Sequence, residues 1–235
     1  DGDFYRVTGS KTFITSGVRA DFYTVAVRTG AEGFAGVSLL LIEKGTPGFS
    51  VGRSLKKMGW WASDTAELFF DDCQVPVENL IGVENMGFAG IMANFQSERL
   101  SLAIMANMTS QLALEEATRW AKERDAFGKP IGKFQVLKHR LAEMATQLEV
   151  SREFTYRQAA KMAAGKSVIK EISMAKNFAT DVSDRITYDA TQILGGMGFM
   201  RESLVERLYR DNRILSIGGG TREVMNEIIS KQLGL

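Results

Sequence analysis

The sequence predicts an α+β, multi-domain chain, in which part of a β-barrel or sandwich is followed by an up-down four-helix bundle. Residues 1–80 form short segments rich in β-branched and aromatic residues, separated by Gly, Pro and Asp. After Asn79, apolar residues recur at spacings of three and four, and no proline follows Pro130. We therefore expect a partial middle β domain over residues 1–80 and a helical domain over residues 81–235.

The β part should consist of antiparallel strands joined by tight turns. Turn residues recur at roughly even spacing, which is typical of a barrel or sandwich. The chain begins with Asp1 rather than Met and opens directly on a hairpin arm, so we expect part of a longer protein to precede it. The predicted strands are Phe4–Thr15, Asp21–Thr29, Gly36–Lys44, Phe49–Leu55 and Ala66–Val75.

The helical part contains four periodic segments with short connections, the pattern of an antiparallel bundle. In the second segment, one continuous apolar stripe runs through Phe134, Leu137, Leu141, Met144 and Leu148. The predicted helices are Met86–Arg124, Phe134–Ala164, Val168–Leu194 and Thr221–Leu233.

Composition excludes several classes of function. A net charge of +1 gives no general attraction to nucleic acid or membranes, and the longest apolar run, Val37–Ile42, is too short to span a bilayer. The single cysteine, Cys73, cannot form an internal disulfide, which fits a reducing compartment. The single histidine, His139, argues against a metal cluster and against Ser–His or Cys–His catalysis.

One carboxylate stands apart from the solvated charges. Glu98 lies in the apolar helix Met92–Met108, where burial would raise its pKa and suit it to general-base catalysis. A structural ion pair explains the same residue equally well, and the residues alone leave both interpretations open. A second unusual stretch, Ser216–Val224, holds three consecutive glycines and no acid, base or nucleophile before Glu223.

Five motifs follow one another along the chain: Tyr5–Asp21, Lys56–Gly82, Lys122–Gln135, Asp189–Phe199 and Gly218–Val224. In this order and spacing they resemble the acyl-CoA dehydrogenases, flavoproteins that oxidise acyl-CoA thioesters between the α and β carbons. The resemblance extends over essentially the whole chain and implies FAD as cofactor. In that family a helical N-terminal domain precedes a β domain and a bundle, so this chain would match the later part of the middle domain and all of the bundle.

The resemblance implies FAD contacts at several places along the chain. Phe13, in a position often held by Trp, would lie against the flavin ring with Ile14 and Thr15. Ala126 replaces a Thr found in some members, and one phosphate hydrogen bond would be lost with it. The other implied contacts are Arg124 at the pyrophosphate, Phe127 packing beside the cofactor, Gln135 near the adenosine, Thr221 and Glu223 closing over the cofactor, and Gln192, Gly195 and Gly196 on the FAD of a neighbouring subunit.

The resemblance also implies where the catalytic base lies. Many members carry a loop glutamate, but this chain has Gly219 at that position. A long-chain and isovaleryl subgroup places the base on the first bundle helix in a Glu-Arg-Leu motif, matched here by Glu98, Arg99 and Leu100. Glu98 would then abstract the α proton as the β hydride leaves to the flavin. The substrate-binding residues implied are Arg99, Gly219 and Gly220, the glycines allowing a loop N–H to approach the thioester carbonyl.

By the same resemblance we expect an enzyme of fatty-acid β-oxidation. The implied partners are an electron-transfer flavoprotein and further copies of the chain in a dimer or tetramer. The implied compartment is the cytoplasm in a bacterium or the mitochondrial matrix in a eukaryote. Alternatives are an acyl-CoA oxidase-like flavoprotein that uses oxygen, or a non-catalytic oligomerisation fragment. Nitroalkane oxidation uses an aspartate base, against which Glu98 argues.

Overall fold

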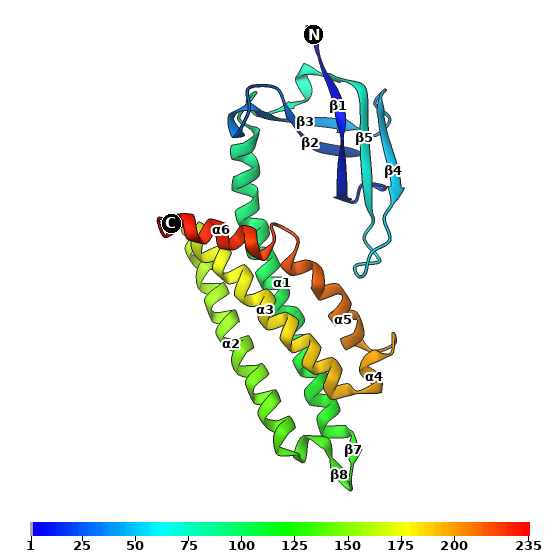
Figure 1. The fold of residues 1–235 in the computed structure, drawn as a ribbon, viewed down its shortest axis with the longest axis vertical. Helices are drawn as coiled ribbons and strands as arrows, with labels where there is room; N and C mark the ends of the chain where they lie inside the picture. Colours follow the sequence, from blue (N-terminus) through cyan, green and yellow to red (C-terminus); the bar gives the residue numbers. More distant parts are fainter. Residues whose placement is uncertain (1) are drawn as a thin grey trace. The chain divides into compact units, whose positions relative to one another are not determined.

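The computed structural model describes residues 2–235, which form two compact units that divide after Asn94. The division falls within helix α1 (Gly87–Glu123), so the first turns of this helix belong to the β unit. The sequence places the domain boundary after residue 80, before α1 begins, whereas the two compact units divide inside α1. The α+β class with a helical C-terminal bundle is confirmed (Figure 1).

The first unit contains two antiparallel three-stranded sheets, and strands cover all five predicted segments. One sheet has the order β1-β5-β4, and the other has the order β2-β3-β6. Short 3-10 turns cover Phe34–Gly36 and Val77–Asn79. The strands are β1 (Phe4–Thr15), β2 (Phe22–Arg28), β3 (Val37–Glu43), β4 (Phe49–Ser54), β5 (Thr65–Pro76) and β6 (Leu80–Ile81).

Alternating burial along the strands builds the core of this unit. In β3, Ser38, Leu40 and Ile42 are buried while the residues between them are partly exposed, as a period of two requires. Cys73 is a fully buried free thiol within this core, consistent with a small hydrophobe at that position. The core consists of Val7, Tyr23, Val25, Leu40, Ile42, Leu68, Phe70, Cys73 and Val75.

The second unit is helical. Three long helices are followed by shorter ones that pack against α3. The hairpin of β7 (Asp125–Ala126) and β8 (Lys129–Pro130) joins α1 to α2, and further 3-10 turns cover Ile131–Lys133 and Arg213–Ser216. The remaining helices are α2 (Gln135–Ala163), α3 (Ile169–Leu194), α4 (Gly196–Phe199), α5 (Leu204–Asn212) and α6 (Arg222–Gln232).

Small residues form the buried stripe of α1. Ala103, Ala106, Ala113, Ala117 and Ala121 recur at helical spacing and are at most 1% exposed. A buried hydrogen-bond network also joins α1 to α2: Asn107 Nδ2 donates to Thr155 Oγ1 at 3.0 Å, and Ser151 Oγ donates to Asn107 Oδ1 at 2.5 Å. Because both ends of the Asn107 amide are satisfied, this polar network fixes the register of the two helices.

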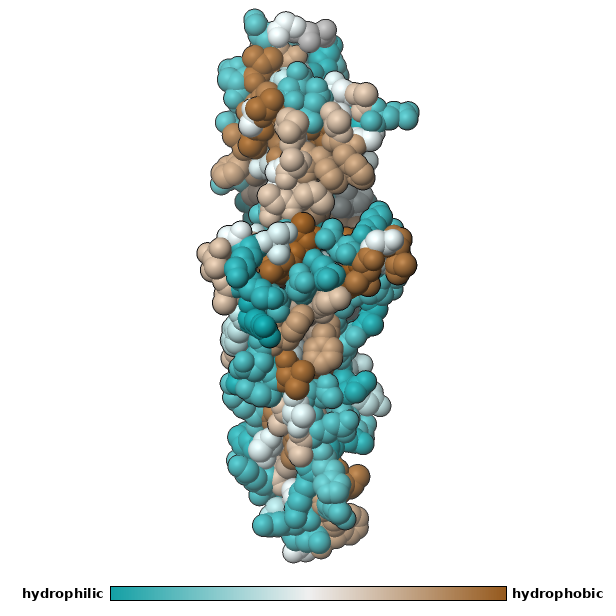
Figure 2. All heavy atoms as spheres, turned by 90° about the vertical axis from the view of Figure 1, so that its left-hand side faces the viewer, coloured by the Kyte–Doolittle hydropathy of each residue, from teal (hydrophilic) through white to brown (hydrophobic). Residues whose placement is uncertain are grey.

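One face of the bundle is mainly polar. On the face that Figure 2 shows, hydrophilic residues cover most of the helical part and apolar residues occupy small groups. Within residues 2–235, no helix combines the length and the apolar character that crossing a membrane demands.

Candidate functional site

The glycine loop, residues 217–221, takes a backbone conformation that ordinary side chains avoid. Gly219 has φ of +65° and Gly220 has φ of +102°, both in the left-handed region. A Cβ at position 219 would lie 2.7 Å from Leu102 Cδ1, so Leu102 would have to move. A glutamate at position 219 would therefore need a backbone conformation that L-residues rarely adopt, and it would have to displace the Leu102 methyl group.

Two buried cations bind this loop. Arg99 on α1 donates from Nε to the Gly219 carbonyl at 3.1 Å, and Lys176 on α3 donates from Nζ to the Gly220 carbonyl at 2.5 Å. Arg99 is 4% exposed and Lys176 is 0% exposed. The Arg99 guanidinium also lies 5.4 Å from the centre of the Phe95 ring, a favourable cation–π distance. The loop is thus attached to two different helices by charged donors.

The expectation that Glu98 is the buried charge of this helix is wrong. Glu98 is exposed and Arg99 is buried. Successive residues project about 100° apart around a helix, and on α1 the buried side takes Arg99 and Leu100 and leaves Glu98 outside. The desolvation argument for Glu98 therefore does not hold in this chain, but exposure leaves its carboxylate accessible to a ligand.

The sequence reasoning missed Lys176. Burial, and then the charge of Arg99, lower the pKa of the Lys176 ammonium from 10.5 to about 8. A signal was available, because Lys176 lies one turn from Ile172 and one turn from Thr180, on the inward face of the amphipathic helix α3. A lysine at such a position has to find a polar partner in the interior.

Two residues expected to close over the cofactor lie at the start of α6. Thr221 is the N-cap, and its hydroxyl accepts a hydrogen bond from the Val224 amide. The Glu223 carboxylate accepts a hydrogen bond from the Thr221 hydroxyl and a second one from the Glu223 backbone amide. The first and then the second of these bonds lower the pKa of the Glu223 carboxyl. Both residues therefore stabilise the helix start, whatever else they bind.

Phe127 occupies a strained turn. The β7–β8 hairpin places Phe127 at φ of +51° and Gly128 at φ of +79°, which matches the two-residue turns that favour Asn-Gly. The ring is 95% exposed, and it makes an edge contact with Phe134, with centroids 6.2 Å apart. A bulky residue in the left-handed region with so little packing is a reason to look for a ligand.

The predicted cofactor residues of the bundle lie at its two ends: Thr221 and Glu223 at the start of α6, and the other six at the far end. Arg124, Phe127 and Gln135 lie near the hairpin, and Gln192, Gly195 and Gly196 lie at the α3–α4 junction at that same end, away from α6 (Figure 1). The sixteen residues from Lys176 to Gln192 rise about 24 Å along α3. One copy of the chain therefore does not bring these residues to the glycine loop.

The remaining predicted contacts belong to the β unit. Phe13 has φ of +60° and a 77% exposed ring, next to a register irregularity between Lys11 and Ile14 in the pairing of β1 with β5. Thr15, at the end of β1, is exposed. Phe13 thus shares with Phe127 an exposed ring held on left-handed backbone.

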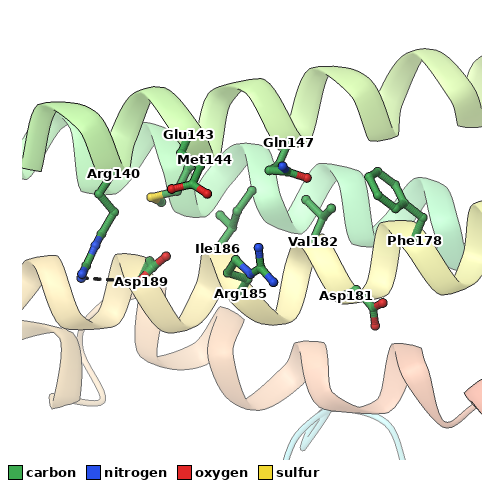
Figure 3. A pocket seen from close by; sticks show the side chains of 10 residues that line it. All are labelled: Arg140, Glu143, Met144, Gln147, Phe178, Asp181, Val182, Arg185, Ile186 and Asp189. Carbon is green, nitrogen blue, oxygen red and sulfur yellow. Dashed lines mark ion pairs between the residues drawn. The ribbon is translucent and has the colours of Figure 1, made fainter.

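A surface groove between α2 and α3 contains none of the predicted site residues (Figure 3). An ion pair joins Arg140 on α2 to Asp189 on α3, with Nη1 and Oδ1 3.5 Å apart. Within residues 2–235, no three His, Cys, Asp or Glu side chains gather as metal ligands would, and His139 is exposed. The groove is lined by Arg140, Glu143, Met144, Gln147, Phe178, Asp181, Val182, Arg185, Ile186 and Asp189.

Two family models cover almost the whole chain. The model of the acyl-CoA dehydrogenase C-terminal domain matches residues 85–234, and that of the acyl-CoA dehydrogenase middle domain matches residues 1–73. The chain belongs to the acyl-CoA dehydrogenase family. The expected order of a middle β domain and a C-terminal bundle agrees with this membership.

Curated relatives and solved structures resemble the chain over nearly its full length. It is 44% identical over 230 residues to an acyl-CoA dehydrogenase of Bacillus subtilis, covering 97% of this chain and 61% of that protein. The crystal structure of an acyl-CoA dehydrogenase from Geobacillus kaustophilus is 44% identical with a TM-score of 0.97, covering 100% of this chain and 63% of that one. The structure of PigA with FAD and proline is 32% identical with a TM-score of 0.95, and the match covers 98% of this chain and 61% of that one. The chain therefore spans about three fifths of the length of these relatives.

Proposed function

We propose that the complete protein that carries this chain is an FAD-dependent acyl-CoA dehydrogenase that uses Glu98 as its α-proton base. The observation that carries the proposal is the pairing of an exposed Glu98 with a glycine loop that has no carboxylate at position 219 and whose backbone there disfavours an L-residue. Arg99, the next residue on α1, binds that same loop. Family membership supports the reaction class, and the geometry around Arg99 and the glycine loop supports Glu98 as the base.

The exposed aromatic rings fit FAD. Phe13 and Phe127 are held on costly left-handed backbone with their rings in solvent, which is understandable if each ring packs against a ligand. Arg124 is exposed and suits phosphate oxygens. Gly195 and Gly196 leave open space where a Cβ would stand. When bound, FAD supplies the hydride acceptor.

The residues of the chain then divide the remaining work. Glu98 takes the α proton of the acyl thioester, and the glycine loop binds the thioester oxygen as negative charge develops there. The amide nitrogens of Gly219 and Gly220 donate to no backbone carbonyl within residues 2–235, so they are available for that oxygen. The cations at Arg99 and Lys176 favour negative charge near the loop.

A complete site needs more than one copy of the chain. The hairpin and the α3–α4 junction lie at the opposite end of the bundle from the glycine loop. We infer that Arg124, Phe127, Gln135 and Gln192 bind the FAD of a neighbouring subunit, while Thr221 and Glu223 serve the subunit's own. The predicted homo-oligomer is then a requirement of the chemistry.

The acyl group and the electron acceptor follow by analogy alone. The position of Glu98 on α1 favours long-chain or branched acyl-CoA, an electron-transfer flavoprotein is the expected acceptor, and fatty-acid β-oxidation is the expected process. The compartment expected is the cytoplasm or the mitochondrial matrix.

The test is to supply the complete, FAD-loaded protein with short, long and branched acyl-CoAs, and to measure enoyl-CoA by mass spectrometry. In parallel, hydrogen peroxide formation is compared with reduction of an electron-transfer flavoprotein. We expect enoyl-CoA with electrons passing to the flavoprotein. Stoichiometric peroxide would favour the oxidase alternative, and no enoyl-CoA from any substrate would overturn the proposal.

A further inference from the structure

We propose that Lys176 is a positioning residue of the active site: its buried ammonium holds the Gly220 carbonyl and thereby fixes the glycine loop. The catalytic consequence rests on the proposed function, whereas the mechanical tie between α3 and the loop does not.

The geometry of Lys176 is that of a dedicated tether. Its side chain is fully buried, and its Nζ donates to the Gly220 carbonyl at 2.5 Å. Within residues 2–235, no carboxylate lies at ion-pairing distance from this nitrogen, and its charged neighbour is another cation, Arg99. The backbone oxygen of Gly220 is therefore the acceptor on which this ammonium depends.

Such an arrangement is costly for the fold. A buried ammonium loses its hydration, and a second cation nearby adds repulsion. An apolar side chain of similar length, such as methionine, would fill the same volume without either cost. The stability of the bundle alone does not explain a lysine here, whereas a need to hold the loop does.

Glycine makes the tether necessary. Three consecutive glycines have broad backbone freedom, so the peptide planes at positions 219 and 220 would reorient easily if nothing held them. Arg99 holds the peptide plane that carries the Gly219 carbonyl and the Gly220 N–H, and Lys176 holds the next plane, which carries the Gly220 carbonyl and the Thr221 N–H. Two adjacent charged donors hold the loop N–H groups in one direction, and small errors in such an alignment are costly for catalysis.

The test compares Lys176→Met with a matched control on the same helix, Lys170→Met, in the complete FAD-loaded protein. Lys170 is 32% exposed and pairs with Glu171, so its replacement removes a lysine without touching the loop. Hydrogen exchange followed by mass spectrometry reports on residues 217–224. We expect amide exchange in residues 217–224 to be at least tenfold faster in Lys176→Met than in the wild type. Exchange in α3 should not change in this variant, and Lys170→Met should exchange like the wild type.

Activity gives the second readout. In Lys176→Met, kcat should fall by about tenfold to a hundredfold with little change in KM, because the loop N–H groups act chiefly in the transition state. Lys176→Gln keeps a neutral hydrogen-bond donor, so it should recover part of the loop protection and part of kcat. This second variant keeps the test valid if Lys176→Met fails to fold. Unchanged loop exchange in both Lys176 variants would overturn the tether, as would equal losses in Lys170→Met. A wild-type protein without dehydrogenase activity would instead overturn the proposed function, and the exchange data would still decide the tether.

Discussion

Arg99 and Gly219 lie 120 residues apart in the sequence, yet the Arg99 Nε is 3.1 Å from the Gly219 carbonyl oxygen. This hydrogen bond links the helix that carries Glu98 to the loop that lacks a carboxylate. The helix segment with Glu98 and the glycine loop, which are far apart in the sequence, are therefore connected through Arg99. Any substitution that moves the loop should therefore also disturb α1.

Gly219→Ala should destabilise the helical unit by about 1–3 kcal/mol. The left-handed backbone at position 219 costs about 1–2 kcal/mol for an L-residue, and the new Cβ would lie 2.7 Å from Leu102 Cδ1. Urea denaturation measures the change.

The matched control is Gly218→Ala. Position 218 does not have positive φ, and a Cβ there would make an ordinary contact of 3.4 Å with the Ile214 carbonyl oxygen, so we expect a change within about 0.5 kcal/mol. Adding Leu102→Ala to Gly219→Ala should recover the steric part of the loss, seen as a favourable coupling in a double-mutant cycle. Equal costs at positions 218 and 219 would contradict the interpretation.

Lys176 should make stability depend on pH in the alkaline range. Its folded pKa of about 8 lies below the ordinary 10.5, so the unfolded chain binds more protons between these two values. The free energy of unfolding should then rise with pH from about 8 to 10.5, by on the order of 3 kcal/mol from this one group.

The difference between the wild type and Lys176→Met isolates this contribution. Urea titrations at pH 7, 8, 9 and 10 should show the wild type gaining stability relative to the variant as pH rises. Lys170→Met should follow the wild type at every pH. A wild-type-minus-variant difference that is constant over this range would show that the Lys176 pKa is the same in the folded and unfolded states.

Phe127→Asn should stabilise the chain without cofactor while weakening FAD binding. Asn tolerates the φ of +51° at this turn position, whereas the 95% exposed Phe127 ring gains little from packing. We expect a gain of about 0.5–1 kcal/mol in the apoprotein and roughly tenfold weaker FAD binding, from melting curves and flavin fluorescence titrations. A variant that loses stability while binding FAD normally would mean that the ring serves the fold.

Periodicity was enough to predict the long elements of the fold. The stripe through Leu137, Leu141 and Met144 led to α2, and the alternating segments of residues 1–80 led to the strands. Helix α4 was not among the predicted helices, because Gly196–Phe199 is too short for a reliable periodic signal.

The site was harder to predict, because adjacent residues on a helix point in different directions. The sequence located Glu98 and Arg99 together in an apolar helix, but which one is buried depends on the orientation of α1 in the bundle. The role of Lys176 could not be predicted from the sequence, because its partner, the Gly220 carbonyl, is 44 residues away in the chain. Motif resemblance indicated the loop, and only the structure reveals what holds it.

The most direct test of the account is Glu98→Gln in the complete protein. The substitution keeps the size of the side chain and removes its ability to accept a proton, so we expect kcat for acyl-CoA oxidation to fall by about 10²–10⁴-fold. FAD content, acyl-CoA binding and the melting temperature should match the wild type, since Glu98 is exposed. A variant that oxidises acyl-CoA at a near-normal rate would contradict the assignment of Glu98 as the base.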